Sequence, residues 1–156
     1  MSHQLVLFAC MHNKGRSQIA SAFFNQLADP EKARSISAGL EPAAYVQLEV
    51  IEVMREVDID LSGVQPVELT SRMITDLSFL VTLGCAERCP SIPLARRRDW
   101  RVRDTANLPI EEVRAIRDEL RGLVTELVSD KDWARAPDDF VRPFGSSTVF
   151  RDRRST

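Results

Sequence analysis

Short apolar runs alternate along this chain with segments whose apolar positions have helical spacing. Residues 5–9 and 79–83 are apolar runs of strand length, which predict two buried strands. Residues 35–38 predict a further short strand that ends at Gly39, and residues 67–69 predict a weakly extended segment. Strands separated by helices indicate an α/β domain with a mostly parallel sheet.

Helical spacing of apolar side chains predicts the helices. The first helix is expected to follow Ser17 as a possible N-cap and to stop near Pro30, and its apolar positions are Ile19, Phe23 and Leu27. The apolar positions of a second helix are Val46, Val50, Val53, Met54 and Val57. A shorter helix is expected over 70–77 and a long final helix over 110–127. Residues 91–109 are predicted to be irregular.

Composition narrows the class of protein. The chain has 156 residues, which suits one domain. A formal net charge of −2 argues against a general nucleic-acid binder. No apolar run approaches the ~20 residues of a membrane span, and residues 5–9 are too few for a signal-peptide core. We therefore expect a cytoplasmic protein that binds neither nucleic acid nor membrane.

The strongest motif lies between the first strand and the first helix. Five residues separate Cys10 from Arg16, and Ser17 follows. Such a loop can point backbone N–H groups at an anion, and the helix N-terminus adds positive potential. Arg16 can clamp two oxygens, and the same field favours a nucleophilic thiolate at Cys10. Ser17 either donates a hydrogen bond to this sulfur or only caps the helix. The candidate oxyanion-binding residues are Met11, His12, Asn13, Lys14, Gly15, Arg16 and Ser17.

Residues 6–18 closely resemble the opening of the arsenate reductases built on the low-molecular-weight protein tyrosine phosphatase fold. The sequence of residues 12–18, His-Asn-Lys-Gly-Arg-Ser-Gln, looks more like that of the reductase branch than that of the phosphatase branch. Other matching segments lie at 37–42, 52–56, 83–90, 99–100 and 112–119. The resemblance implies a three-layer α/β/α fold with a small, mostly parallel sheet. It also implies that Cys10 is the attacking thiolate, Arg16 the oxyanion clamp and Asn13 a hydrogen-bonding residue that shapes the loop.

The resemblance ends near residue 128. We therefore expect a phosphatase-like domain over residues 1–128 and a C-terminal extension of unknown role over residues 129–156. This extension is rich in charge but also carries Trp133, Phe140, Phe144 and Phe150. Because disordered tails are usually poor in aromatic residues, the extension either lies across the domain or is mobile.

Cys85 and Cys89 follow the strand predicted over 79–83. In a parallel sheet their loop and the loop after Cys10 would emerge at the same edge. A phosphatase needs one cysteine, whereas arsenate reduction needs two electrons, which thiols can supply. We therefore expect a relay: Cys10 attacks arsenate, Cys85 forms a disulfide with Cys10 as arsenite leaves, and Cys89 moves the disulfide to Cys85–Cys89. Thioredoxin, or another thiol reductant, would then restore the thiols.

Two other interpretations of these cysteines compete with the relay. Free cysteines are often small buried hydrophobes, and Cys-x3-Cys could be half of a zinc site. The chain has only two histidines, His3 and His12, and the second lies in the anion loop, so a four-ligand zinc site is disfavoured. No metal and no cofactor are expected.

The resemblance also implies a general acid on the loop before the final helix. Asp104 occupies the matching place, and Asp99 is the competing candidate. The family usually has proline after this aspartate, whereas this chain has Thr105, which predicts a less constrained loop. Five neighbouring arginines would either steer anions or form a solvated face, namely Arg96, Arg97, Arg98, Arg101 and Arg103.

The sequence therefore favours a monomeric arsenate reductase coupled to a thiol carrier. The first alternative is a phosphatase acting on phosphate monoesters, because phosphate and arsenate share shape and charge. A non-enzymatic anion sensor is a further alternative, although 156 residues leave no room for a helix-turn-helix module.

Overall fold

A computed structural model describes residues 4–90 and 92–136. The strands are β1 (Gln4–Cys10), β2 (Ala33–Gly39), β3 (Phe79–Leu83) and β4 (Arg97–Trp100). The α-helices are α1 (Arg16–Leu27), α2 (Leu48–Arg55), α3 (Ser71–Asp76) and α4 (Ile110–Asp130). Two short 3-10 turns, η1 (Ala86–Arg88) and η2 (Leu94–Arg96), lie between β3 and β4.

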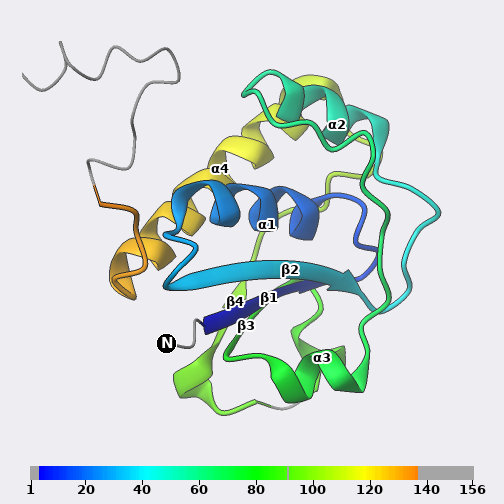
Figure 1. The fold of residues 1–156 in the computed structure, drawn as a ribbon. Coiled ribbons are helices and arrows are strands. Elements are labelled where there is room, and N and C mark those ends of the chain that lie inside the picture. Colours follow the sequence, from blue (N-terminus) through cyan, green and yellow to red (C-terminus); the bar gives the residue numbers. More distant parts are fainter. Residues whose placement is uncertain (1–3, 91, 137–156) are drawn as a thin grey trace, which may run out of the picture.

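Within the described residues, the strands form one parallel sheet in the order β2-β1-β3-β4. Figure 1 shows α1, α2 and α4 on one side of this sheet and α3 on the other. The alternation of side chains along β1 serves both layers. Val6 and Phe8 pack into the larger core under α1, α2 and α4, whereas Leu7 and Ala9 pack into the smaller core beside α3. The expected three-layer α/β/α fold with a parallel sheet is confirmed.

Three expectations about the elements need correction. Residues 91–109 are not wholly irregular, because Arg97–Trp100 form the edge strand β4. The second helix is shorter than predicted, since Val46 precedes it and Val57 follows it. Ser17 is not the N-cap of α1, which starts at Arg16 with Gly15 at the cap position and no side-chain cap.

The final helix runs two residues past the expected domain boundary at 128. Trp133, just beyond it, packs its ring 5.8 Å from that of Phe24 and 6.1 Å from that of Phe79. Ala134 forms an isolated bridge with Ala28. The described part of the extension therefore lies against the domain, while Phe140, Phe144 and Phe150 fall outside the described residues.

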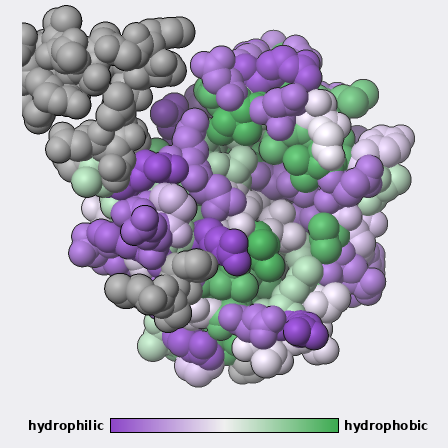
Figure 2. Space-filling view, viewed as in Figure 1, coloured by the Kyte–Doolittle hydropathy of each residue, from purple (hydrophilic) through white to green (hydrophobic). Residues whose placement is uncertain are grey.

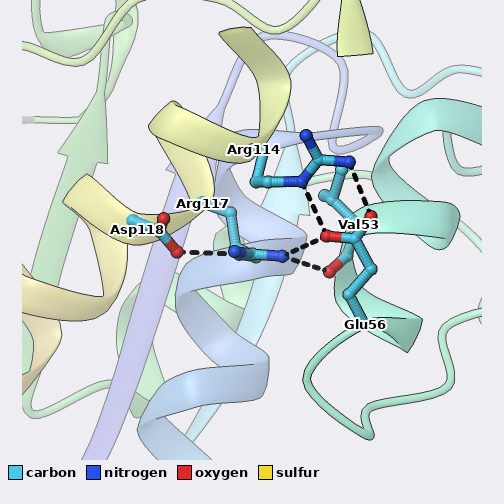
Figure 3. A network of polar contacts seen from close by, with 5 residues as sticks. All are labelled: Val53, Glu56, Arg114, Arg117 and Asp118. Atoms are coloured by element: carbon cyan, nitrogen blue, oxygen red, sulfur yellow. Dashed lines mark hydrogen bonds and ion pairs between the residues drawn. The ribbon is translucent and has the colours of Figure 1, made fainter. Parts of the chain in front are cut away.

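A polar network joins α2 to α4 (Figure 3). Arg114 donates two hydrogen bonds, of 2.8 and 2.7 Å, to the carboxylate of Glu56, the C-cap residue of α2. The buried Arg117 donates to the same carboxylate at 2.7 Å and to the Val53 carbonyl at 2.8 Å, and its Nε donates to Asp118. The bond from Arg114 and that from Arg117 lower the pKa of Glu56 to about 2, although desolvation opposes them. The network keeps α2 against α4, and α2 follows directly from the segment that contacts the anion loop.

The surface is mostly hydrophilic on the face drawn in Figure 2, with hydrophobic side chains in small patches. Among the residues that the structure describes, Tyr45, Leu48 and Leu94 are the most exposed large hydrophobic side chains. None of the helices in the described part of the chain is long and apolar enough to cross a membrane.

Candidate active site

Three loops meet at one edge of the sheet because all four strands run in the same direction. β1 leads into the anion loop at Cys10, β3 leads into the loop that carries Cys85 and Cys89, and β4 leads toward Asp104. In parallel sheets the carboxyl edge is where sites are built. The sequence prediction that the three cysteines share this edge is therefore met by the topology.

The sulfur of Cys10 lies under the anion loop and receives two hydrogen bonds. The backbone N–H of Asn13 donates to it at 3.2 Å, and the hydroxyl oxygen of Ser17 lies 2.8 Å from it. The side-chain amide of Asn13 donates to that same hydroxyl oxygen at 2.7 Å, which directs the Ser17 hydrogen to the sulfur. Of the two roles considered for Ser17, the structure supports the contact with Cys10.

Asn13 holds the loop in shape. Its φ is 53°, in the left-handed region that asparagine tolerates better than most residues. Its side-chain oxygen accepts hydrogen bonds from the Gln18 amide at 3.0 Å and from the Val67 backbone at 2.9 Å. Gly39 at the end of β2 completes the enclosure, since a Cβ there would lie 2.9 Å from the Asn13 nitrogen. The weakly extended segment near Val67 thus supports the anion loop.

Arg16 links the anion loop to the other two loops. Its Nη1 donates to the carbonyl of Val102 at 2.7 Å. The same guanidinium passes over Gly84, where a Cβ would lie 2.6 Å from Nη1 and where φ is +79°. Only glycine suits both conditions at position 84. Arg16 is therefore held between the loop after β3 and the loop after β4.

Asp104 and Asp99 lie in different places. Asp104 lines the small hollow above Cys10, and its carboxylate accepts a hydrogen bond of 3.2 Å from the Ala106 backbone. The other residues that line this hollow are Cys10, His12, Asn13, Lys14, Gly15 and Arg16. Asp99 instead lines a separate cavity of about 730 Å³ beside Cys85. Of the two aspartates, only Asp104 lines the hollow that Cys10 also lines.

Thr105 anchors the Asp104 loop in place of a proline. Its side chain is buried, and its hydroxyl donates to the Gln47 side-chain oxygen at 2.8 Å. The Gln47 side-chain amide donates back to the Thr105 carbonyl at 3.1 Å. The Gln47 backbone N–H donates to the backbone carbonyl of Lys14, in the anion loop, at 3.0 Å. Gly15 leaves the space that Thr105 occupies, since a Cβ there would collide with its hydroxyl. The expected loosening of this loop is wrong, because hydrogen bonds fix it.

Gln47 and Thr105 are functional candidates that sequence reasoning missed. Gln47 lies 58 positions from Thr105. No local pattern signals a contact between residues so far apart, and the only sequence signal was the departure from proline at position 105.

Cys85 and Cys89 form a hydrogen-bonded pair with their sulfurs 2.9 Å apart. The hydrogen bond from Cys89 lowers the pKa of Cys85 to about 7, with further contributions from Arg16 and Arg97, although burial opposes the shift. The same bond, together with burial, raises the pKa of Cys89. The hydrogen bond between the two sulfurs thus favours the thiolate on Cys85 over that on Cys89.

The cysteine pair also lies close to the nucleophile. The Cys85 sulfur is 3.4 Å from the carbonyl oxygen of Ala9, the residue before Cys10. Cys10 and Cys85 are each 3% exposed, whereas Cys89 is half-buried. No cluster of three or more His, Cys, Asp or Glu side chains suited to a metal occurs among the described residues.

The anion loop and the fold can now be compared with known protein families. A family model described as low molecular weight phosphotyrosine protein phosphatase matches residues 5–135. The chain belongs to this family. The match extends past residue 128 and includes the Trp133 segment that packs on the core.

Relatives within this family bear on the chemistry. An arsenate reductase of Staphylococcus aureus is 33% identical over 126 residues, which cover 78% of this chain and 93% of the relative. The structure of a thioredoxin-dependent arsenate reductase of Corynebacterium glutamicum is 34% identical with a TM-score of 0.69. That match covers 82% of this chain and 61% of the other. An arsenate reductase structure from Archaeoglobus fulgidus is 29% identical with a TM-score of 0.68, and the match covers 80% of this chain and 98% of that one.

Proposed function

We propose that this protein reduces arsenate to arsenite through Cys10, Cys85 and Cys89. The observation that carries the proposal is the pair of thiols, 2.9 Å apart, at the same sheet edge as the anion loop. Hydrolysis of a phosphate ester needs one nucleophilic cysteine, and a hydrogen-bonded dithiol beside it adds nothing to that reaction. The dithiol is what a two-electron reduction requires.

In the first step the Cys10 thiolate attacks the arsenic atom of arsenate. Backbone N–H groups of residues 11–16 and the Arg16 guanidinium hold the oxyanion, as at other helix N-termini. Asp104 donates a proton to the departing oxygen, which leaves as water. A bond between the Cys10 sulfur and As(V) forms, and no electrons have yet been transferred.

In the second step the Cys85 thiolate attacks the Cys10 sulfur. The sulfur–arsenic bond breaks, its electron pair passes to arsenic, and arsenite leaves as As(III). Cys85, whose lowered pKa makes it the thiolate of the pair, is suited to this attack. Cys89 then loses its proton and attacks Cys85, so that Cys10 departs as a thiolate and the disulfide moves to Cys85–Cys89.

An external dithiol reductant completes the cycle, and we assign thioredoxin to this role. Cys89 is the most exposed of the three cysteines, so it is the thiol that a protein reductant can reach. All three cysteines are free thiols, as expected in a reducing cytoplasm, where we place the protein. Since one chain supplies all three cysteines of the relay, we infer that the protein acts as a monomer. Reduction of arsenate to arsenite would contribute to arsenic detoxification.

Arsenate-dependent oxidation of NADPH, with thioredoxin and thioredoxin reductase present, tests this proposal. We expect one NADPH consumed per arsenate and no consumption when arsenate is omitted. Hydrolysis of an aryl phosphate is measured in parallel, because the anion loop suits phosphate equally well. Hydrolysis without any NADPH oxidation would make the protein a phosphatase. Turnover only with glutaredoxin or a small thiol would support the reductase function but would mean that thioredoxin is not the reductant.

Replacing Thr105 by valine should slow turnover more than it weakens arsenate binding. Valine keeps the buried shape, but the Gln47 oxygen loses its donor at 2.8 Å and the Asp104 loop loses its anchor. General acids contribute roughly 10²–10⁴-fold, so partial misplacement of Asp104 should lower kcat about tenfold. KM for arsenate should stay within about twofold, because none of the anion loop donors is changed.

Steady-state kinetics of Thr105→Val and Thr105→Ser distinguish this effect from a general loss of stability. Serine retains the hydroxyl and should restore most of the rate. Equal losses in both variants, or a rise in KM with kcat unchanged, would contradict the role given to this hydrogen bond.

A further inference from the structure

Two adjacent arginines of β4 point to opposite faces of the sheet. Arg98 reaches Asp130 of α4, with 3.4 Å between nitrogen and oxygen. Arg97 faces the other way, toward the cysteine loop, where its Nη2 donates to the carbonyl of Ala86 at 3.1 Å. Its side chain is only 13% exposed. Burial of a guanidinium costs free energy, and nothing in the steps above uses this one.

A second hydrogen bond, to Asp99, holds Arg97 in place. Its Nε donates to the Asp99 carboxylate at 2.9 Å, and the Thr82 hydroxyl donates to the same oxygen at 2.6 Å. Thr82 is buried, and it is the register partner of Asp99 across β3 and β4. Hydrogen bonds therefore run from the middle of the sheet through Asp99 and Arg97 to the residue next to Cys85. Asp99 therefore anchors the Arg97 side chain in this chain.

The charge of Arg97 bears on both thiols. It lowers the pKa of Cys85 and also opposes the rise in the pKa of Cys89. Arg16 is the other cation that lowers the pKa of Cys85, whereas Asp99 raises that of Cys89. Glu87 and Arg88 lie on the cysteine loop itself, and Arg88 is paired with Glu41. Arg97 is thus the one cation that acts on both sulfurs among the described residues.

We propose that Arg97 is a positioning residue of the cysteine pair. Its guanidinium holds the loop through the Ala86 carbonyl and keeps a positive charge beside the loop that carries Cys85 and Cys89. Its effect on turnover rests on the proposed reductase function. Its effect on the thiols does not, because it can be measured without arsenate.

The direct test is a thiolate titration by ultraviolet absorbance of the reduced chain in a Cys10→Ser background. Arg97→Met and Arg97→Gln both remove the charge, and glutamine retains a hydrogen-bond donor in case methionine prevents folding. We expect the first midpoint, near pH 7 in the parent, to rise by about one unit, as for loss of a nearby opposite charge. Arg97→Lys should recover most of the shift. Arg98→Gln, which changes the neighbouring arginine on the opposite face, should leave the midpoint unchanged.

The disulfide equilibrium gives an independent measurement. Removing the charge destabilises the reduced thiolate form, so the equilibrium constant for forming the Cys85–Cys89 disulfide against dithiothreitol should rise about tenfold above pH 8. Below about pH 6 both thiols are protonated in every variant, and the difference should disappear. A fall in the stability of the loop alone would not depend on pH in this way.

Equal midpoints and equal disulfide equilibria in the parent, Arg97→Met and Arg97→Gln would overturn the proposal. The same shift in Arg98→Gln would also overturn it, since it would mean that any nearby arginine acts. These outcomes are independent of arsenate turnover. Failure of the reductase assay with the thiol shifts present would therefore overturn the proposed function and leave the role of Arg97 standing.

Discussion

Cys10→Ser is expected to abolish arsenate turnover. The serine hydroxyl has nearly the same shape as the thiol, but it is a far weaker nucleophile than the sulfur that the Asn13 N–H and the Ser17 hydroxyl contact. Loss of a covalent nucleophile typically removes several orders of magnitude, so we expect a fall of more than about 10⁴-fold. Hydrolysis of aryl phosphates, if the parent shows it, should fall with it because both reactions begin at this sulfur.

Binding provides the control for this variant. The residues that face the hollow above position 10, including Arg16 and Lys14, are unchanged, so phosphate should still bind within about tenfold of the parent by calorimetry. The thermal midpoint should change little, since the substitution nearly preserves volume. Arsenate turnover within a factor of ten of the parent would remove Cys10 from the mechanism, and with it the whole assignment.

Cys89→Ser should convert the enzyme to a single turnover. Cys85 can still attack Cys10, so one arsenite should be released per chain, and a Cys10–Cys85 disulfide should accumulate. Both sulfurs of that disulfide belong to residues that are 3% exposed, so thioredoxin cannot reach them and cycling should stop. Rapid quenching and arsenite analysis measure the burst, and intact mass without reductant should show the loss of two hydrogen atoms.

Cys85→Ser is the matched variant. It removes the thiolate that attacks Cys10, so neither an arsenite burst nor a Cys10 disulfide should form, although arsenate can still react at Cys10. A sustained steady state for Cys89→Ser with thioredoxin, or an arsenite burst in Cys85→Ser, would contradict the order of the relay. If a small thiol restores steady-state turnover of Cys89→Ser and arsenite release by Cys85→Ser, that thiol attacks the arsenic adduct directly.

Much of the fold was predictable because its central elements carry strong local patterns. The apolar runs at 5–9 and 79–83 became β1 and β3, which are buried on both faces and therefore need apolar residues throughout. β4 was missed because it is an edge strand whose side chains include two arginines and an aspartate. Charged side chains are common on edge strands, and they leave no apolar period to detect.

The chemistry of the site was predictable wherever it lies within one short segment. Cys10, Asn13, Arg16 and Ser17 belong to one strand–loop–helix unit, so their spacing alone indicates an anion loop with a nucleophile. The same local reasoning misplaced the N-cap. Ser17 lies inside the first turn of α1, where its hydroxyl is turned toward the Cys10 sulfur by the Asn13 amide.

The sequence by itself determined the α/β class, the anion loop and the presence of a dithiol, because each depends on residues that are neighbours along the chain. Only the tertiary structure decided which aspartate lines the hollow above Cys10 and how Thr105 and Gln47 fix the loop that carries it. Those features depend on contacts across 58 or more positions, as between Thr105 and Gln47 or between Arg16 and Val102. Such contacts arise when parallel strands bring their carboxyl ends to one edge, and no local pattern of residues records them.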